Sequence, residues 1–422
     1  MSPSVVRPKS PPPYQRPNLY IHGIGAAYPP HSVKAEELSI LARRFHPSTP
    51  ALEKVLYINE LTGIETRSTI ATINHPLANR SEPPNISELS KVFLDHGVRL
   101  SVEACRKAVA DWGGDMSDLT HMVAVTCTNS ANPGYDHYVV KQLGLNTSIE
   151  KVLLHGVGCS GGLAALRTAA NIAQGASFRS RPARILVLAC EITSLLVRSE
   201  LESIVQLQET RIGVTLFSDC ASAVVLGNGF GDDPMEEPIL ELLGWDHRII
   251  DDTEDDLGFD VDPLGWKVIL TPRVPKLASA SVAPVFTDLV TSIPELTGAD
   301  KVNATDFDWA LHPGGATVIT GVEQAMGLTP EHLRASYDIY MNHGNSSSAT
   351  VFAVIDRLLR MGEGNQYITS CAFGPGIAIE MMMLKRLGSS RTGTESPGTA
   401  SFGSESPAEV NGEELLEVPA VD

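Results

Sequence analysis

Two segments of this chain share one order of parts: an apolar run of strand length, a glycine-rich turn and a stretch of helix length. The first is 151–170, KVLLHGVGCSGGLAALRTAA, and the second is 307–326, FDWALHPGGATVITGVEQAM. Strands that lead into helices in this way favour a layered α/β architecture. The two segments lie in different halves of the chain, so each half contains one copy of this weakly repeated pattern.

Further apolar runs and amphipathic stretches continue this alternation along the chain. We expect strands over 121–126, 152–155, 185–189, 223–226 and 308–311. We expect helices over 101–112, 161–174 and 349–361. Short apolar runs that alternate with longer amphipathic stretches are typical of α/β folds.

Both ends of the chain have the composition of tails. Residues 1–17 are rich in Pro, Ser and basic residues, and 388–422 carry seven acids and one arginine with little apolar periodicity. Such segments bury too little apolar surface to offset the entropy lost on ordering, so we expect both to be disordered. Between them we expect an N-terminal half at 18–235 and a C-terminal half at 236–387. The acidic run 251–256, DDTEDD, is expected to be an exposed loop.

The balance of charge and the cysteine pattern exclude several functions. The chain has 50 acidic and 32 basic residues, a net charge of −18 with neutral histidines. General DNA or RNA binding is excluded because it depends on Lys and Arg that neutralise phosphates, although one small anionic ligand in a local pocket is not. The six cysteines have no metal-ligand spacing, which predicts reduced thiols and no metal site. No apolar run reaches about 18 residues, so we expect no membrane span and a cytoplasmic protein.

Cys159 lies in the glycine-rich turn of the first segment, just before the predicted helix. A helix N-terminus stabilises a thiolate, because its free N–H groups and the positive end of its dipole face the sulfur. This position favours a nucleophile with a lowered pKa. Cys105 and Cys190 lie among alanine and aliphatic residues, and we expect both to be buried and inert.

The same turn, from Gly156 to Gly161, also matches the G-x-G-x-x-G pattern of dinucleotide-binding folds. That pattern requires an acidic residue about 20 residues further on, which binds the ribose hydroxyl. Glu191 follows the next predicted strand, but it lies 30 residues beyond Gly161. This spacing makes a dinucleotide-binding module the weaker alternative.

A nucleophilic cysteine needs a basic or cationic partner and a further polar group. His312 follows the strand of the second segment at a junction like that of Cys159, and Asn345 lies in a polar turn ahead of a predicted helix. Three junctions of one type therefore present three chemically useful groups. His155 and His343 are further candidates for the basic partner of Cys159. Each also has a structural alternative, His155 as a hydrogen-bond partner and His343 as a helix cap. Sequence spacing alone leaves the pairing open.

Six short motifs are spread through both halves of the chain. They are G-x-G-C-x-G-G around Cys159, L-F-S-D at 216–219, G-W-K-V at 265–268, H-P-G-G at 312–315, G-N-S-S-S at 344–348 and C-A-F-G-P-G at 371–376. In combination they resemble the type III polyketide synthases, the chalcone synthase-like branch of the thiolase superfamily, and its fungal members especially. The resemblance implies a thiolase-like αβαβα layered fold made of two pseudo-duplicated halves, in a homodimer. Ala372 departs from the family's G-F-G-P-G signature.

The resemblance implies catalytic roles for three residues. Cys159 would accept a starter acyl group from acyl-CoA as a thioester, with His312 keeping the thiolate ionised. His312 and Asn345 would stabilise the enolate that forms when malonyl-CoA loses carbon dioxide. Repeated condensation would lengthen a poly-β-ketone that finally cyclises. No cofactor is implied, because acyl-CoA and malonyl-CoA are substrates.

The resemblance also assigns residues to the substrate path. Cavity positions match Phe217, Thr193, Leu196, Phe259, Val268 and Ser347, and CoA-binding positions match Lys54, Gly314 and Gly315. Relative to the plant enzymes, Val268 replaces a gatekeeper aromatic, Leu196 a threonine and Phe259 a glycine. Tyr57 and Leu61 occupy two further positions that are basic in the family. The redirected cavity and the fungal motifs favour a fatty acyl-CoA starter and an alkylpyrone, alkylresorcinol or alkylresorcylic acid product.

Two other enzyme classes use Cys, His and Asn side chains. A ketoacyl-carrier-protein synthase III has the same fold and residue types for a single condensation, but the H-P-G-G and F-G-P-G motifs argue against it. A papain-like protease has these residues in the same chain order, but the chain lacks a C-G-S-C-W type signature. The sequence therefore predicts a type III polyketide synthase.

Overall fold

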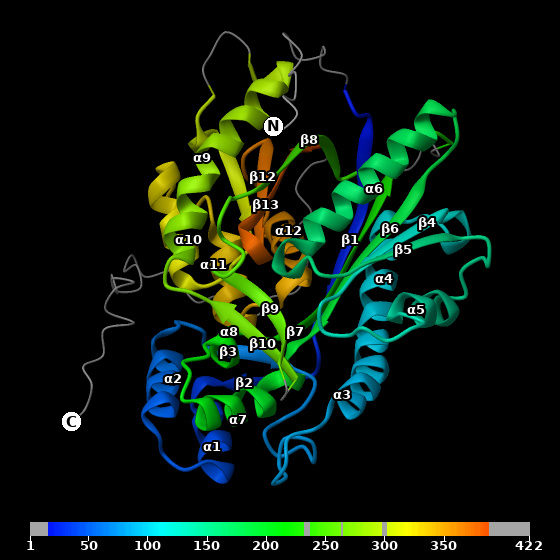
Figure 1. The fold of residues 1–422 in the computed structure, drawn as a ribbon. Helices are drawn as coiled ribbons and strands as arrows, with labels where there is room; N and C mark the ends of the chain where they lie inside the picture. The colour runs from blue at the N-terminus through cyan, green and yellow to red at the C-terminus, as the bar shows by residue number, and fades with distance from the viewer. Residues whose placement is uncertain (1–15, 232–236, 263–264, 298–301, 388–422) are drawn as a thin grey trace, which may run out of the picture.

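The computed structural model describes residues 16–231, 237–262, 265–297 and 302–387 (Figure 1). Of the two predicted tails, 1–17 and 388–422, only Arg16 and Pro17 belong to the described residues. The strands are β1 (Leu19–Ala27), β2 (His31–Lys34), β3 (Thr66–Thr69), β4 (His121–Val125), β5 (Glu150–Leu154), β6 (Arg184–Ile192), β7 (Asp219–Gly227), β8 (Leu240–Ile249), β9 (Leu257–Asp262), β10 (Gly265–Leu270), β11 (Phe307–Leu311), β12 (Tyr367–Gly374) and β13 (Ala378–Arg386). The α-helices are α1 (Ala35–Phe45), α2 (Pro50–Leu61), α3 (Ile86–Val92), α4 (Val98–Trp112), α5 (Tyr135–Leu143), α6 (Gly161–Phe178), α7 (Val197–Leu207), α8 (Gly213–Leu216), α9 (Val274–Ser292), α10 (Ala316–Met326), α11 (Arg334–His343) and α12 (Thr350–Arg360). Short helical turns that matter for the site are η3 (Gly158–Ser160), η4 (Thr193–Leu196) and η7 (Ser347–Ala349).

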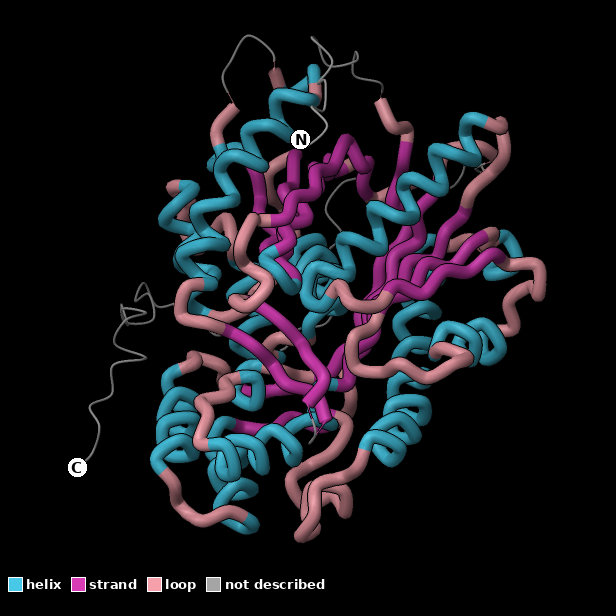
Figure 2. The backbone as a smooth tube through the Cα atoms, in the orientation of Figure 1, coloured by secondary structure: helices cyan, strands magenta, loops and turns pink. Residues whose placement is uncertain are grey.

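Nine strands form one mixed sheet, in the order β11-β12-β13-β8-β1-β7-β6-β4-β5. The strands from β1 to β5 in this order belong to the first half of the chain, and those from β11 to β8 belong to the second. The halves meet where the start of β1 pairs with β8. Figure 2 shows the strands running through the centre of the molecule with helices on both sides. The α/β class predicted from the sequence is confirmed.

Both halves repeat one pattern of strand pairing. In the first, β4 and β6 are parallel, whereas β6 and β7, and then β7 and β1, are antiparallel. In the second, β11 and β12 are parallel, whereas β12 and β13, and then β13 and β8, are antiparallel. The counterpart of β11 is therefore β4 and not β5. The duplication exists, but the two segments compared in the sequence are displaced by one strand–helix unit.

Helices α6 and α12 lie together between the two halves of the sheet. Their apolar residues share one core with β1, β4, β6, β12 and β13. Alternate residues of the same strands face two other cores, since Val123 contacts the central helices while Met122 and Ala124 pack with α4 and α5. Helices α9 and α10 cover the outer face of the second half. The layers thus follow the αβαβα order of a thiolase-like fold.

A helical cluster lies beside these layers and has its own apolar core. It consists of α1, α2, α7 and the region leading to α8, seen at the lower left of Figure 1 next to the β2–β3 pair. Helix α8 ends at Leu216, directly before Phe217 and strand β7. Phe217 therefore lies at the boundary between the helical cluster and the sheet.

The acidic run 251–256 forms the predicted turn between β8 and β9, with four of its five carboxylates exposed. Asp256 corrects the prediction, because it is only 3% exposed. Its carboxylate accepts a hydrogen bond from the Thr271 hydroxyl and lies 3.3 Å from Arg273 Nη1. Asp256 therefore stabilises the fold through side-chain contacts, whereas the other four carboxylates face solvent. Over the part of the chain that the structure describes, none of the helices combines the length and apolarity that a membrane span requires.

Candidate active site

Cys159 lies in η3, the single turn that leads from β5 into α6. Gly158 precedes it with a φ of 55°, in the left-handed region that favours glycine, and a Cβ there would lie 2.6 Å from Pro375 Cδ. On the other side, a Cβ at Gly162 would lie 2.4 Å from the carbonyl oxygen of Ser348. These two glycines allow the C-A-F-G-P-G and G-N-S-S-S motifs to approach the cysteine turn.

Cys159 is partly exposed as a residue, and its Sγ lies 3.4 Å from Ser347 Oγ. Burial raises the pKa of this thiol to about 11, while hydrogen bonds with the Ser347 and Asn345 side chains act in the opposite direction. The expectation of a lowered pKa is therefore wrong, because the lost hydration of the sulfur outweighs the stabilisation at the helix end. Cys159 needs a base to remove its proton.

His312 follows β11, where its backbone N–H donates to the carbonyl oxygen of Cys371 at 2.8 Å. The residue is 1% exposed, and neither Nδ1 nor Nε2 has a hydrogen-bond partner among the described residues. Burial lowers the pKa of the imidazole to about 3, so the ring is neutral. Buried polar atoms are rarely left unpaired without a functional reason. The ring of His312 is therefore available to a proton donor or a substrate.

Asn345 is oriented by hydrogen bonds at both ends of its amide. Its Oδ1 accepts from the backbone N–H of Ser347 at 2.8 Å, and its Nδ2 donates to the carbonyl oxygen of Gly314 at 3.2 Å. The same amide stabilises the thiolate form of Cys159. Since Gly314 belongs to the turn that begins at His312, the structure brings the three predicted junctions together.

Two predicted cavity residues, Val268 and Phe217, lie next to Gly213, and a third, Phe259, is paired with Val268. A Cβ at Gly213 would lie 2.8 Å from Val268 Cγ2 and 3.4 Å from Phe217 Cδ2. Val268 is paired with Phe259 across the β9–β10 hairpin. The backbone of Phe217 forms a parallel bridge with Asn345. These contacts connect the proposed cavity wall directly to the catalytic turn.

The other two cavity positions, Thr193 and Leu196, lie in η4 and are both buried. Thr193 Oγ1 donates to the carbonyl oxygen of Ser218 at 2.5 Å, beside Phe217. Leu196 belongs to the core against which Phe259 packs. Ser347, the sixth position, is the one in direct contact with the thiol.

Glu191, at the end of β6, supports the site, a role that its sequence context did not predict, because there it matches only the acid of a dinucleotide pattern. Its carboxylate is fully buried and accepts hydrogen bonds from Ser348 Oγ at 2.5 Å, Thr128 Oγ1 at 2.8 Å and the Cys127 N–H at 3.1 Å. Cys127 Sγ in turn lies 3.7 Å from Ser347 Oγ. The network therefore holds Ser347 in place, and the hydroxyl of Ser347 contacts the Cys159 thiol. Its sequence signal was an acid at the end of an apolar strand.

This network also weighs against the dinucleotide alternative, because protein groups already occupy the Glu191 carboxylate. The two competing histidines are engaged elsewhere. His155 Nε2 lies 3.0 Å from the carbonyl oxygen of Asn129, and His343 Nδ1 lies 2.9 Å from Ser68 Oγ. His155 has the structural hydrogen bond that its alternative predicted, whereas His343 bonds to strand β3 rather than capping a helix.

All six cysteines lie within the described residues and are free thiols, as their spacing predicted. Cys105 and Cys190 have no exposed surface, and burial raises the pKa of each, which confirms their expected burial. Among the described residues, no group of three His, Cys, Asp or Glu side chains is placed to hold a metal ion.

The predicted CoA-binding positions lie in two places. Lys54 is on α2 in the helical cluster, apart from the three junctions, together with Tyr57 and Leu61, which are 50% and 37% exposed. Helix α2 packs against α8, which leads into Phe217. Gly314 and Gly315 instead lie in the His312 turn.

Comparison with known families identifies the family to which this chain belongs. The model of the N-terminal domain of chalcone and stilbene synthases matches residues 16–230, and that of the C-terminal domain matches residues 243–388. The chain belongs to the chalcone and stilbene synthase family. Within this family it is a type III polyketide synthase, a CoA-dependent acyltransferase that condenses with decarboxylation.

Several of the relatives that this chain resembles are fungal. The type III polyketide synthase pspB of Penicillium soppii is 43% identical over 385 residues, which cover 88% of this chain and 96% of the relative. The acylalkylpyrone synthase csyB of Aspergillus oryzae is 38% identical, with coverage of 88% and 96%. The solved structure of a type III pentaketide synthase from Neurospora crassa is 57% identical, with a TM-score of 0.86, and covers 88% of this chain and all of that chain.

Proposed function

We propose that this type III polyketide synthase transfers a fatty acyl group from acyl-CoA to Cys159 and extends it with malonyl-CoA. The poly-β-ketone then closes to an alkylpyrone, alkylresorcinol or alkylresorcylic acid. The observation that carries the proposal is that hydrogen bonds of Ser347 and Asn345 link the Cys159 turn to the turn that begins at His312, whose ring has no partner among the described residues. No resident cofactor takes part.

The first step is acyl transfer to the thiol. His312 accepts the proton of Cys159, and the thiolate attacks the carbonyl carbon of the acyl-CoA thioester. Ser347 and Asn345 stabilise the thiolate while it exists. As the bond to CoA breaks, the imidazolium returns its proton to the leaving thiolate, so free CoA departs and His312 is neutral again. An acyl thioester remains on Cys159.

The second step is condensation with malonyl-CoA. Loss of carbon dioxide leaves the electron pair on the acetyl unit as an enolate, whose oxygen carries the negative charge. A neutral His312 has one ring N–H to donate to that oxygen, and the Asn345 amide supplies a second donor. The enolate carbon then attacks the acyl thioester, and the Cys159 thiolate leaves. Transfer of the longer chain back to Cys159 allows another cycle.

Two observations support a fatty acyl starter. Val268 provides a small side chain at the wall next to Phe217, while Phe259 fills the position paired with it. The relative csyB is named for an acylalkylpyrone product, and a neighbouring solved structure of CsyB, 38% identical to this chain, holds CoA-SH. The product name and the bound CoA-SH of this relative fit an enzyme that takes an aliphatic acyl-CoA.

We also propose that the enzyme is a homodimer that pairs through β5. This strand is the outermost member of the nine-stranded sheet, and Glu150, Lys151 and Val152 are exposed. Val152 is 41% exposed, which places an apolar side chain on an open edge. An open sheet edge with an apolar residue favours pairing with a second chain.

The function is tested by incubating the purified enzyme with malonyl-CoA and acyl-CoAs of increasing chain length, with products identified by mass. We expect long aliphatic starters to be preferred and the acyl group to be found on Cys159 when malonyl-CoA is omitted. The Cys159→Ala variant should form no condensation product. Product at the wild-type rate from that variant would overturn the mechanism. A preference for acetyl or aromatic starters would overturn the proposed substrate class alone.

A further inference from the structure

A second chamber lies behind Phe217, away from the catalytic turn. Its unfilled space, about 840 Å³, includes open solvent. Helix α1, strand β3, the segment after it, η4, α7 and α8 provide its walls. Among the residues assigned to the substrate path, Phe217 alone lines it, and Cys159, His312 and Asn345 do not.

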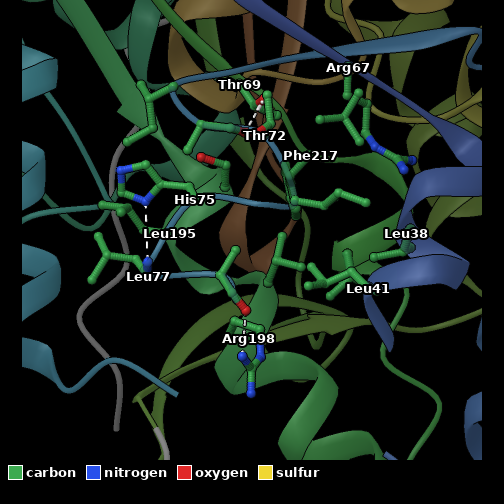
Figure 3. A pocket seen from close by; sticks show the side chains of 18 of the residues that line it. Leu38, Leu41, Arg67, Thr69, Thr72, His75, Leu77, Leu195, Arg198 and Phe217 are labelled. Atoms are coloured by element: carbon green, nitrogen blue, oxygen red, sulfur yellow. Dashed lines mark hydrogen bonds between the residues drawn. The ribbon is translucent and has the colours of Figure 1, made fainter. Parts of the chain in front are cut away.

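The chamber has mainly aliphatic walls. Figure 3 shows Leu38 and Leu41 on one flank and Leu77 and Leu195 on the other, with Phe217 between them. Such a lining favours an alkyl group, because its burial removes apolar surface from water.

The charged groups of the chamber are all basic. Its lining contains Arg67, Arg198 and two histidines, and no Asp or Glu, in a chain whose net charge is −18. The two arginines lie on different sides of the space in Figure 3. They are 4% and 3% exposed, respectively. A buried cation normally has a carboxylate partner, so this composition is unusual.

Neither arginine has a carboxylate within ion-pair distance among the described residues. Arg67 Nη1 donates to Asn59 Oδ1 at 2.8 Å and to the Thr215 carbonyl oxygen at 2.7 Å, and no hydrogen bond engages its Nε or Nη2 in that part of the chain. Arg198 donates from Nη1 and Nη2 to backbone carbonyl oxygens of residues 78, 80 and 81. Its buried Nε has no partner among the described residues. Burial lowers the pKa of both side chains.

We propose that this chamber binds the anion of a fatty acid, with the alkyl chain along the aliphatic wall and the carboxylate at Arg67. The Nε and Nη2 groups of one guanidinium have the fork geometry that a carboxylate accepts. Arg198 contributes a second positive charge that has no carboxylate within ion-pair distance among the described residues. The chamber is separate from the site of acyl transfer, and the inference does not depend on the proposed starter.

The test is calorimetric titration of the enzyme with dodecanoate, below the concentration at which it forms micelles. Cys159 is first alkylated with iodoacetamide, which prevents covalent chemistry at the catalytic turn. We expect saturable binding with one site per chain. Dodecanol, which keeps the chain and lacks the charge, should bind at least about tenfold more weakly. Absence of saturable binding, or equal binding of the alcohol, would overturn the proposal.

Two tryptophan variants on α1 locate the binding site. Leu41 lines the chamber, so Leu41→Trp fills it and should weaken dodecanoate binding by at least about tenfold. Ile40, its neighbour, is 48% exposed and does not line the chamber, so Ile40→Trp should bind as the parent enzyme does. Unchanged binding in Leu41→Trp would place the fatty acid in the catalytic cavity and overturn the proposal. Condensation assays on the same variants without alkylation test the proposed function independently.

Discussion

Ser347 lies between two thiols, with its hydroxyl 3.4 Å from Cys159 Sγ and 3.7 Å from Cys127 Sγ. At the scale of single residues, this hydroxyl is one of the two side-chain groups that favour the thiolate of Cys159 against the effect of burial. The backbone N–H of Ser347 also orients the Asn345 amide. Ser347 therefore connects the nucleophile, through its hydroxyl, to the oxyanion donor, through its backbone N–H.

Replacing this hydroxyl should make the thiolate harder to form. In Ser347→Ala the thiolate loses a hydrogen bond, so the pKa of Cys159 rises and its alkylation by iodoacetamide needs a higher pH. The measurement is the rate of alkylation as a function of pH. Ser346→Ala is the matched control, because the Ser346 hydroxyl bonds to Ser218 Oγ at 2.7 Å and not to the thiol. An unshifted profile in Ser347→Ala would show that the hydroxyl does not act on Cys159.

Val268 sets the size of the cavity wall beside Phe217. It is 9% exposed and lies against Gly213, so a larger side chain must extend toward the space that Phe217 and Phe259 border. Val268→Phe should shift starter use toward shorter acyl chains and shorten the products, as measured by mass with a mixture of acyl-CoAs. Ile269→Phe is the control on the opposite face of β10. The pocket role fails if both variants give the parent product spectrum.

At the scale of elements, glycines decide how closely the motifs approach one another. A Cβ at Gly374 would lie 2.1 Å from Ser160 Oγ and 2.6 Å from the carbonyl oxygen of Val157. Gly374→Ala should therefore displace the cysteine turn, lower the free energy of unfolding by about 1–3 kcal/mol and reduce condensation. Urea unfolding and product yield check the two effects.

The control for Gly374→Ala is Gly175→Ala, in the helix that follows the cysteine turn. Gly175 is in α6, and a Cβ there would meet no atom within 4 Å. Gly175→Ala should leave condensation unchanged and raise the free energy of unfolding by about 0.5–1 kcal/mol, since alanine restricts the unfolded chain and favours helix. Equal destabilisation in the two variants would mean that the contacts of Gly374 are not responsible.

The elements with strong local patterns were predictable from sequence, as α4, α6, α12 and the strand β6 show. Their existence follows from apolar periodicity, which each segment carries by itself. The pairing of strands does not, because position in a sheet depends on contacts between distant segments. For this reason the two glycine turns looked equivalent, although β5 and β11 occupy different places in the repeat.

The site shows the same limit. Cys159, His312 and Asn345 were found because each lies at a glycine-marked junction that local sequence reveals. The hydrogen bonds of Glu191 come from two separate segments, 127–128 and Ser348, and only the folded chain brings these together with β6. Likewise, the raised pKa of Cys159 depends on burial, which the helix-end argument left out.

At the scale of the whole molecule, the net charge of −18 is not spread evenly. Seven acids belong to 388–422 and five to the turn 251–256, most of which is exposed. The chamber behind Phe217 instead contains two arginines and no acid. Overall repulsion of polyanions, which excludes nucleic acid, is therefore compatible with local attraction of one small anion.

The open edge at β5 gives the last prediction. If two chains pair there, Val152 lies near the two-fold axis, and Val152→Asp places like charges next to each other in the interface. Light scattering after size-exclusion chromatography should give twice 45.2 kDa for the parent enzyme and 45.2 kDa for the variant. Ile249→Asp is the control, because Ile249 is 68% exposed on β8, away from this edge, and the variant should remain dimeric. A parent enzyme that is monomeric, or a Val152→Asp variant that stays dimeric, would rule out pairing through β5.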